Sequence, residues 1–390
     1  MRRIIKNCYF RWYSERGEAD WNNGFDQPDK QCKDDVMDGV TGMMRKGSVL
    51  AAVMIGIFIL CGCGSVKDQP VKNIKIGISV YDQYDTFVSQ MMSAFNAYAM
   101  QKQEETGITV NVEIYNASGS QSTQNEQVES MIEEGCNVVC VNLVDRTDPT
   151  AIIDAAEKNN VPVIFFNREL VEEDLGRWEK LYYVGAEAFE SGIMEGELAA
   201  EAFHERAELD KNQDGIFQYI VLEGEVGHQD AIVRTEYSVN TIIQKGVSVE
   251  KLGYAIANWN RAQAQTKMNQ LLEEYGSQIE LVLANNDDMA LGAIDALKAQ
   301  NIPQSEWPAV VGIDGTDVGL EAVRNGEMIG TVYNDKEGQA AAMLELACTL
   351  STDGAVSAVD KLDGNTIRLP YIKVSAKEAG SFTPPGAEGY

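Results

Sequence analysis

Hydrophobic and polar residues alternate in a regular way from residue 74 onward, beginning with apolar side chains at every second position from Ile74 to Val80. A period of two predicts a strand with one buried face. Helix-like and strand-like stretches then take turns along the chain. The helix-like stretches lie at about 86–105 and 122–134, and the strands at 110–114, 138–143 and 161–166. A β-α-β-α series of this kind predicts a parallel sheet with helices on both faces.

The same alternation resumes in the second half of the chain, and 390 residues are long enough for two domains. We expect strands near 217–223, 252–256, 280–284 and 309–313, and helices near 187–206, 230–244, 262–275, 288–298 and 339–350. Several strands end in polar residues, namely Asn142, Asn285, Asn286 and Asp314. Ligands of open α/β sheets bind beyond the carboxyl ends of the strands, so these residues are candidate contacts. The alternative is that they cap helices, a common role of Asn and Asp.

Composition narrows the classes of function. Apolar residues make up 44% of the chain and charged residues 24%, which is ordinary for a globular protein with a buried core. The formal net charge of −28 argues against a nucleic-acid partner, because phosphates are bound through Lys and Arg. The sequence contains no GxSxG, HExxH, P-loop or GxGxxG motif and only two histidines, His204 and His228. We therefore do not expect an enzyme.

A short apolar segment before the patterned region is typical of a secretion signal. Arg45 and Lys46 form a basic start, and the apolar run 49–60 has the length of a signal-peptide core but is short for a membrane-spanning helix. The LCGC sequence that ends at Cys63 resembles a bacterial lipobox, in which Cys63 is the acylated residue. A plain transmembrane anchor is the alternative. We expect a non-native extension at 1–42 with translation starting at Met43 or Met44, a lipoprotein signal peptide at 43–63 and a tether at 64–73.

Residues 210–218 carry oxygen-bearing side chains at the spacing of a calcium loop. Asp, Asn, Asp and Gln occupy loop positions 1, 3, 5 and 9, and Gly215 at position 6 allows the sharp turn. Ile216 at position 7 would offer its backbone carbonyl. Position 12 is Val221 rather than the usual Glu, so the bidentate ligand must come from elsewhere or the site is weak. The alternative is an Asp- and Gly-rich turn between a helix and a strand.

A second group of polar residues opens the helix expected at 230–244. Asp230 and Arg234 are four positions apart and therefore share a helix face, and His228 lies just before them. These three residues suit the recognition of several hydroxyl groups, although acid–base catalysis, or an N-cap with a surface ion pair, would also explain them. Phe87 and Trp259 each follow a strand beside polar residues. Flat rings of this kind cover the apolar faces of a pyranose, and ordinary core packing is the alternative.

Eight stretches between about Lys75 and Tyr371 resemble the bacterial glucose/galactose-binding proteins, which are periplasmic-type receptors of ABC sugar transporters. The stretches are KIGISVYDQYDTF, NLVD, VPVIFFNRE, YYVGAEAFESG, LDKNQDGIFQ, LEGEVGHQDAIVRT, ANNDDMALGAIDALKAQN and GTVYND. The resemblance implies two similar α/β domains, each a Rossmann-like sandwich around a parallel sheet, with the sugar in the cleft between them. It implies a first lobe of 74–161 plus 334–370, and a second lobe of 162–333 plus 371–390 that contains the calcium loop.

The resemblance also implies which residues hold the ligands. Two aromatic rings, Phe87 and Trp259, would sandwich the pyranose. Polar side chains from both lobes would hydrogen-bond its hydroxyl groups, namely Asp85, Asn142, His228, Asp230, Arg234, Asn286, Asp314 and Asn334. A calcium ion would be bound by Asp210, Asn212, Asp214, the Ile216 carbonyl, Gln218 and, as the remote bidentate carboxylate, Glu280.

The resemblance and the signal segment together imply a monomeric lipoprotein, anchored through Cys63 on the outer face of the cell membrane. It would close on D-galactose or D-glucose and deliver the sugar to the permease of an ABC importer. Because the contacts come from both lobes, sugar binding would be coupled to hinge closure. The alternatives are a receptor for another monosaccharide such as a pentose, and a sugar-sensing partner of a chemoreceptor or histidine kinase.

Overall fold

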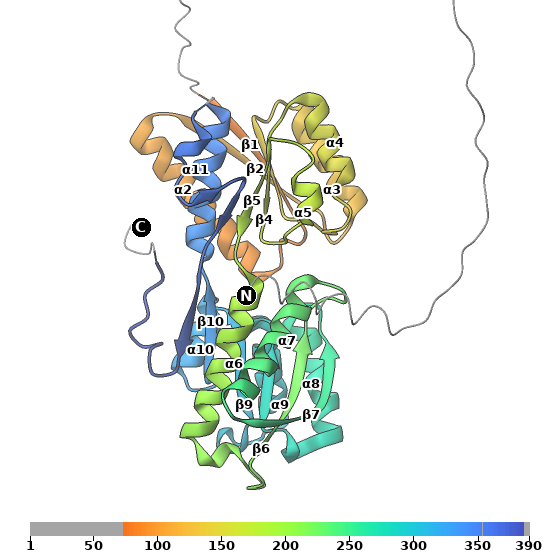
Figure 1. Ribbon diagram of the computed structural model, residues 1–390, viewed down its shortest axis with the longest axis vertical. Helices are drawn as coiled ribbons and strands as arrows, with labels where there is room; N and C mark the ends of the chain where they lie inside the picture. The colour runs from red at the N-terminus through yellow and green to blue at the C-terminus, as the bar shows by residue number, and fades with distance from the viewer. Residues whose placement is uncertain (1–72, 353, 386–390) are drawn as a thin grey trace, which may run out of the picture. The chain divides into compact units, whose positions relative to one another are not determined.

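The computed structural model describes residues 73–352 and 354–385 (Figure 1). The predicted extension, signal peptide and acylated Cys63 lie outside these residues, as does the predicted tether except for Asn73, where the first strand begins. Two α/β lobes with mostly parallel sheets are present, which confirms the predicted fold class. No helix within the described residues combines the length and the apolar character that crossing a membrane requires.

The first lobe is built on a sheet of seven strands in the order β11-β12-β5-β4-β3-β1-β2. Its strands are β1 (Asn73–Val80), β2 (Thr109–Asn116), β3 (Val138–Val141), β4 (Val163–Phe166), β5 (Leu181–Gly185), β11 (Leu362–Asp363) and β12 (Thr366–Arg368). All neighbours pair in parallel except β11 and β12, which form an antiparallel pair at the edge. The parallel order brings the carboxyl ends of six neighbouring strands, β12 and β1 to β5, to one edge of the sheet.

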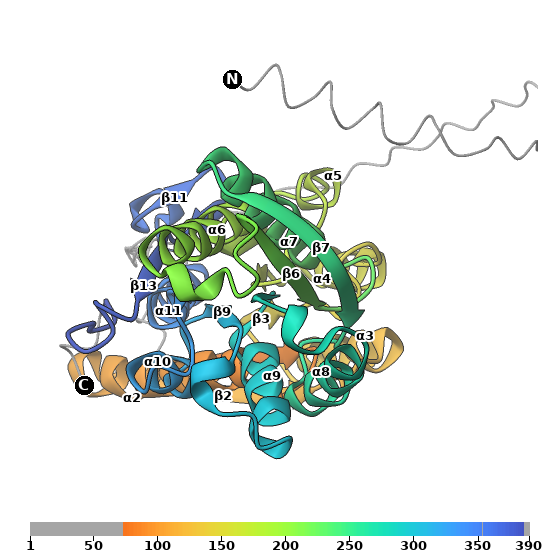
Figure 2. The ribbon, with the colours of Figure 1, turned by 90° about the horizontal axis from the view of Figure 1, so that it is seen from below.

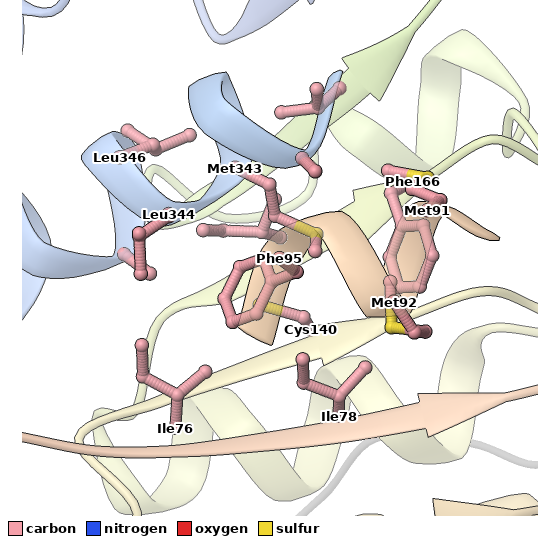
Figure 3. Close-up of a cluster of buried hydrophobic side chains, with 14 of the residues drawn as sticks. Ile76, Ile78, Met91, Met92, Phe95, Cys140, Phe166, Met343, Leu344 and Leu346 are labelled. Atoms are coloured by element: carbon pink, nitrogen blue, oxygen red, sulfur yellow. The ribbon is translucent and has the colours of Figure 1, made fainter. Parts of the chain in front are cut away.

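Helices cover both faces of this first sheet. α2 (Thr86–Thr106) and α11 (Lys336–Ser351) lie side by side on one face, and α3 (Gln121–Glu133), α4 (Thr150–Asn159) and the single turn α5 (Glu172–Leu175) cover the other (Figure 1). Figure 3 shows Ile76 and Ile78 of β1 pointing toward Phe95 of α2 and Met343 of α11. Because side chains alternate along a strand, the intervening positions of β3 and β4 pack instead against α3 and α4.

The second lobe is built on a sheet of six strands in the order β13-β10-β9-β8-β6-β7. Its strands are β6 (Ile216–Glu223), β7 (Ser248–Ile256), β8 (Leu281–Ala284), β9 (Ala309–Asp314), β10 (Gly330–Asn334) and β13 (Tyr371–Ser375), of which only β13 is antiparallel to its neighbour. Figure 2 shows α6 (Ala188–Glu205) and α7 (Gln229–Gln244) on one face, and α8 (Arg261–Tyr275) and α9 (Asp287–Ala299) on the other, where α10 (Asp317–Arg324) also packs.

Within the described residues, the chain passes between the two sheets at three places: between β5 and α6, between β10 and α11, and between β12 and β13. The first crossing corrects the predicted lobe boundary at 161/162. β4 pairs with β3, and β5 pairs with β4, so both strands belong to the first lobe. The boundary therefore falls between Gly185 and Ala188. The prediction failed because an apolar strand such as Val163–Phe166 does not reveal its pairing partner.

Candidate functional site

A pocket lies where the carboxyl ends of strands from both sheets meet. Its lining residues come from both lobes and are Tyr81, Asp85, Phe87, Asn167, Arg168, His228, Asp230, Arg234, Trp259, Asn286 and Asp314. The cavity left among these side chains is about 30 Å³, so the lining residues nearly fill the space between the lobes in this arrangement. Eight of the ten residues predicted to contact a sugar are therefore brought together, although they span more than 220 positions of sequence.

Three of the lining residues also cap helices, so the two roles that the sequence left open for polar strand ends coexist. The Asp85 side chain accepts a hydrogen bond from the Val88 backbone N–H at 2.8 Å at the start of α2. Asn286 accepts from the backbone N–H of Met289 at the start of α9 at 2.9 Å. Capping fixes the rotamer of each side chain at a helix N-terminus. A short loop from strand to helix thus delivers an oriented oxygen atom into the pocket.

His228 caps α7 and is neutral. Its Nδ1 accepts a hydrogen bond from the backbone N–H of Asp230 at 3.1 Å. Burial, and next the charge of Arg168, lower the pKa of His228 to about 3. A neutral imidazole whose Nδ1 accepts carries its proton on Nε2. His228 is therefore a hydrogen-bond donor on its remaining side, not a proton carrier near neutral pH.

Arg234 is one of two buried arginines that line the pocket, with only 4% of its surface exposed. Its guanidinium lies 3.6 Å from Asp230 and 3.7 Å from Asp314, and donates to the Asn285 carbonyl at 2.7 Å. Asp230 and Arg234 thus face each other along α7, at the spacing read from the sequence. The Nε atom of Arg234 is buried and has no hydrogen-bond partner among the residues that the structure describes. One charged N–H group of this side chain is therefore left unpaired by the protein.

Asp314 is held in a backbone conformation that L-residues rarely adopt, with φ at 117°. The turn that follows is fixed by the buried Asp287, which accepts hydrogen bonds from the Thr316 backbone N–H at 2.7 Å and from the Thr331 hydroxyl at 2.6 Å. Burial raises the pKa of Asp314, and the charge of Arg234 opposes this rise. Strained residues persist only where their surroundings over-determine them, and here Asp287 supplies part of that constraint.

The two aromatic rings of the pocket come from opposite lobes. Phe87 lies in the first turn of α2, and Trp259 lies in the loop between β7 and α8. The Trp259 ring contacts the His228 ring edge-on at 5.1 Å between centroids. A Cβ at Gly224 would lie only 2.2 Å from the Trp259 ring, so glycine is required for the ring to rest against this backbone. The Trp259 ring is therefore held in place by its neighbours in the second lobe.

Two residues that were predicted to contact the sugar, Asn142 and Asn334, are buried but are not among the residues that line the pocket. Asn142 is fully buried and donates to Asn167 Oδ1 at 3.0 Å, while its own Oδ1 has no hydrogen-bond partner from residues 73–352 or 354–385. Asn334 is 2% exposed and accepts from the Gln339 side chain at 2.6 Å.

Three lining residues were not singled out from the sequence. Tyr81 follows β1, and Asn167 and Arg168 follow β4. Burial raises the pKa of Tyr81, whose hydroxyl donates to Asp85 at 2.6 Å. The rule that ligands bind beyond the carboxyl ends of strands applies to these residues too, and it is the signal that could have identified them.

The loop predicted to hold calcium closes largely on its own polar groups. Asp210 accepts from the Gly215 backbone N–H at 2.9 Å, and the Asp214 carboxylate accepts from the Ile216 N–H at 2.8 Å. Glu280, remote in sequence, accepts from the backbone N–H groups of Lys211 at 2.6 Å and Gln218 at 3.2 Å. The remote carboxylate is thus adjacent to the loop.

The fit of this loop to a metal ion rests on mixed oxygen ligands. In the part of the chain that the structure describes, no three His, Cys, Asp or Glu side chains are grouped so that they could hold a metal ion. However, Gln218 is 4% exposed, and its Oε1 has no hydrogen-bond partner in the described part of the chain. An amide oxygen that is buried and unpaired costs free energy, and amide oxygens are ordinary ligands of Ca²⁺. The chemistry of the donors therefore fits calcium better than a transition metal.

Comparison with known proteins identifies a common architecture. The family model described as periplasmic binding protein domain matches residues 76–355. The chain is 32% identical over 342 residues to the D-galactose/methyl-galactoside binding periplasmic protein of Haemophilus influenzae, covering 87% of this chain and 99% of that protein. It is 28% identical over 307 residues to a xylitol-binding protein of Mycolicibacterium smegmatis, covering 78% of this chain and 80% of that protein.

A solved structure shows the same fold with a ligand. It is an ABC transporter solute binding protein from Bacillus halodurans with bound myo-inositol, with a TM-score of 0.65 at 26% identity, covering 80% of this chain and 98% of that chain. The three proteins named in these comparisons are binding proteins, which confirms the expectation that the chain is not an enzyme.

Proposed function

Because this chain belongs to the periplasmic binding protein family, we propose that it is an extracytoplasmic receptor that closes on one hexose, D-galactose or D-glucose, and delivers it to an ABC importer. The observation that carries the choice of a sugar is the buried Nε of Arg234, which has no partner inside a pocket lined with oxygen atoms. A charged donor left unpaired in this way is satisfied by a ligand hydroxyl group.

The other polar groups of the pocket suit a ligand that offers several hydroxyl groups. Each hydroxyl both donates and accepts, and the pocket supplies carboxylate acceptors together with the Nε2–H donor of the neutral His228. A hydroxyl buried without a partner would cost about 1–3 kcal/mol, so a complementary set is needed. Carboxylates at Asp85, Asp230 and Asp314 favour a neutral polyol over an anion, because a second negative charge would be desolvated beside them.

The aromatic rings support a pyranose in particular. Phe87 and Trp259 offer flat apolar surfaces from the two lobes, and the faces of a pyranose ring carry C–H groups. The choice of galactose or glucose follows the Haemophilus influenzae relative, which is named for D-galactose and methyl-galactoside. The xylitol-binding relative makes other polyols and monosaccharides the competing ligands.

Isothermal titration calorimetry tests the proposal directly. The purified mature protein should bind D-galactose or D-glucose more tightly than ribose, xylitol or myo-inositol. Tighter binding of ribose or xylitol would contradict the hexose assignment while leaving a sugar receptor in place. No heat with any of these ligands would contradict the proposed function.

We also propose that a lipid on Cys63 holds the receptor at the membrane, since two acyl chains are sufficient for stable anchoring. Cys63 lies outside the described residues, so the support is the LCGC sequence and the apolar run before it. Mass spectrometry of the membrane-bound protein should find a mature chain that begins at an acylated Cys63. A peptide from upstream of Cys63 in that fraction would contradict this assignment.

We propose in addition that the loop at Asp210–Gln218 and Glu280 bind one Ca²⁺. The support is the loop spacing, the adjacent Glu280 and the unpaired Oε1 of Gln218. A bound divalent cation would link the start of β6 to the residue before β8 and stabilise the second lobe. Thermal unfolding in CaCl₂ and in chelator measures this directly, since binding to the folded state alone raises the melting temperature.

A further inference from the structure

An ion pair joins the two lobes beside the pocket. Arg168 follows β4 of the first lobe, and Glu225 lies in the loop between β6 and α7 of the second. The guanidinium donates two hydrogen bonds to the carboxylate, from Nη1 at 3.0 Å and from Nη2 at 2.9 Å. Paired N–H donors on a carboxylate form the strongest common type of ion pair. Because the two residues belong to different lobes, this pair must break when the lobes separate.

Arg168 is fixed on the side of the first lobe. Its guanidinium carbon lies 3.5 Å from the centre of the Tyr81 ring, and its Nη1 also donates to the Val144 carbonyl at 3.1 Å. Only 4% of Arg168 is exposed. Tyr81 in turn donates to Asp85, a lining residue that caps α2. The cation is therefore pre-positioned by its own lobe, so little side-chain entropy is lost when Glu225 joins it.

A second contact between the lobes lies at the start of α2. The Thr86 hydroxyl donates to the Asp288 carboxylate of α9 at 2.7 Å. Thr86 stands between two lining residues, Asp85 and Phe87. The lobes are therefore linked at two places next to the pocket, and neither link needs an atom of the ligand.

We propose that Arg168 and Glu225 form a closing contact that sets how long the sugar is retained, a proposal that rests on the proposed function. Glu225 does not line the pocket, whereas Arg168 does. Glu225 therefore acts on affinity as a positioning residue, by stabilising the closed arrangement of the lobes. A contact made only in the closed state raises the population of the binding-competent state and slows ligand release. The Arg168–Glu225 contact should therefore change the dissociation rate of the sugar more than its association rate, because the contact forms only after the sugar has entered.

Stopped-flow measurement of galactose and glucose binding to the Glu225→Gln variant tests this proposal. Glutamine keeps the size of the side chain but removes the charge that pairs with Arg168. We expect dissociation to become faster by about tenfold, with the association rate changed less than about twofold, as for other close charge pairs across interfaces. Raising the ionic strength should speed dissociation from the wild type and have less effect on the variant, since Glu225 is partly exposed.

Asp295→Asn is the matched control. Asp295 accepts two hydrogen bonds from Arg261, at 2.6 and 2.9 Å, but both residues lie in the second lobe. This variant should bind and release sugar at the wild-type rates. An unchanged dissociation rate in Glu225→Gln, or an equal change in Asp295→Asn, would overturn the closing contact while the receptor function stands. A wild-type protein that binds no sugar would contradict the receptor function and this proposal with it.

Discussion

Replacing Arg234 by methionine removes a buried cation that contacts two carboxylates of the pocket. Methionine matches the length of the aliphatic stem, so the change is mainly one of charge and hydrogen bonding. The wild-type guanidinium lies 3.6 Å from Asp230 and 3.7 Å from Asp314, and its Nε has no protein partner. Hydrogen bonds to charged groups contribute about 1.5–3 kcal/mol, so sugar affinity should fall by about 10- to 150-fold.

The same variant should lose stability in a pH-dependent way. Removing one partner of a buried pair costs about 3–5 kcal/mol, because the remaining charge is left without compensation. Burial already raises the pKa of Asp314, and the loss of Arg234 will raise it further. A carboxyl group whose pKa is higher in the folded state than in the unfolded state makes the free energy of unfolding fall as the pH rises from the lower pKa through the higher one. The loss of unfolding free energy in the variant, relative to the wild type, should therefore be smaller at pH 5 than at pH 8.

Calorimetry with galactose and glucose, together with urea unfolding at both pH values, measures these effects. Arg261→Met is the control, because the Arg261–Asp295 pair is partly exposed and should contribute only about 0–1 kcal/mol. Sugar affinity within about threefold of the wild type would refute the assignment of Arg234 Nε to a sugar hydroxyl, since one charged hydrogen bond alone predicts about tenfold. A deficit in stability that does not change with pH would refute the role given to Asp314.

Three further changes test other parts of the structure. Trp259→Ala should weaken sugar binding by about 1–3 kcal/mol in calorimetry, judged from truncation of large aromatic residues at interfaces, and wild-type affinity would show that the ring only packs. Glu280→Gln should lower the melting temperature more in CaCl₂ than in chelator; an equal loss in both would remove Glu280 from the metal site. Burial raises the pKa of Glu195 from 4.5 to about 8, so its contribution to stability is full below pH 4.5 and is lost as the pH rises toward 8. The free energy of unfolding of Glu195→Gln, measured in urea at pH 5.5 and 8.5, should fall less between these pH values than that of the wild type. An equal fall in the two proteins would contradict this assignment.

Local patterns predicted the elements well but not their pairing. The period-two run at Ile74–Val80 lies within β1, and the helix expected at 230–244 is α7 at Gln229–Gln244. Strands β5 and β10 were not recognised, because short buried strands carry no periodicity of their own. The boundary between the lobes was misplaced for a related reason. Which strand an apolar run pairs with is decided by tertiary contacts that lie outside the run.

The candidate site could be predicted where its residues follow a strand and open a helix. His228 and Asn286 were identified in this way, whereas Asp85 was implied only by the family resemblance, and all three line the pocket. Arg168 and Glu225 could not be predicted in this way, because each acquires its role from a partner in the other lobe. The strained backbone of Asp314 could not be predicted from the sequence either, since it depends on the contacts of the buried Asp287 rather than on neighbouring residues in the chain.

The three crossings between the sheets determine how the protein would respond to cleavage. Neither lobe is one continuous piece of chain, because the first is assembled from β1–β5 together with α11, β11 and β12. A protease that cuts one of the three crossing segments would leave the other two intact. The two fragments would stay associated, because each contributes strands or helices to the same lobe. Expressing residues 73–185 alone would leave α2 without α11, and with it an apolar helix face open to water. An independent first lobe therefore requires the two stretches to be joined by a new linker.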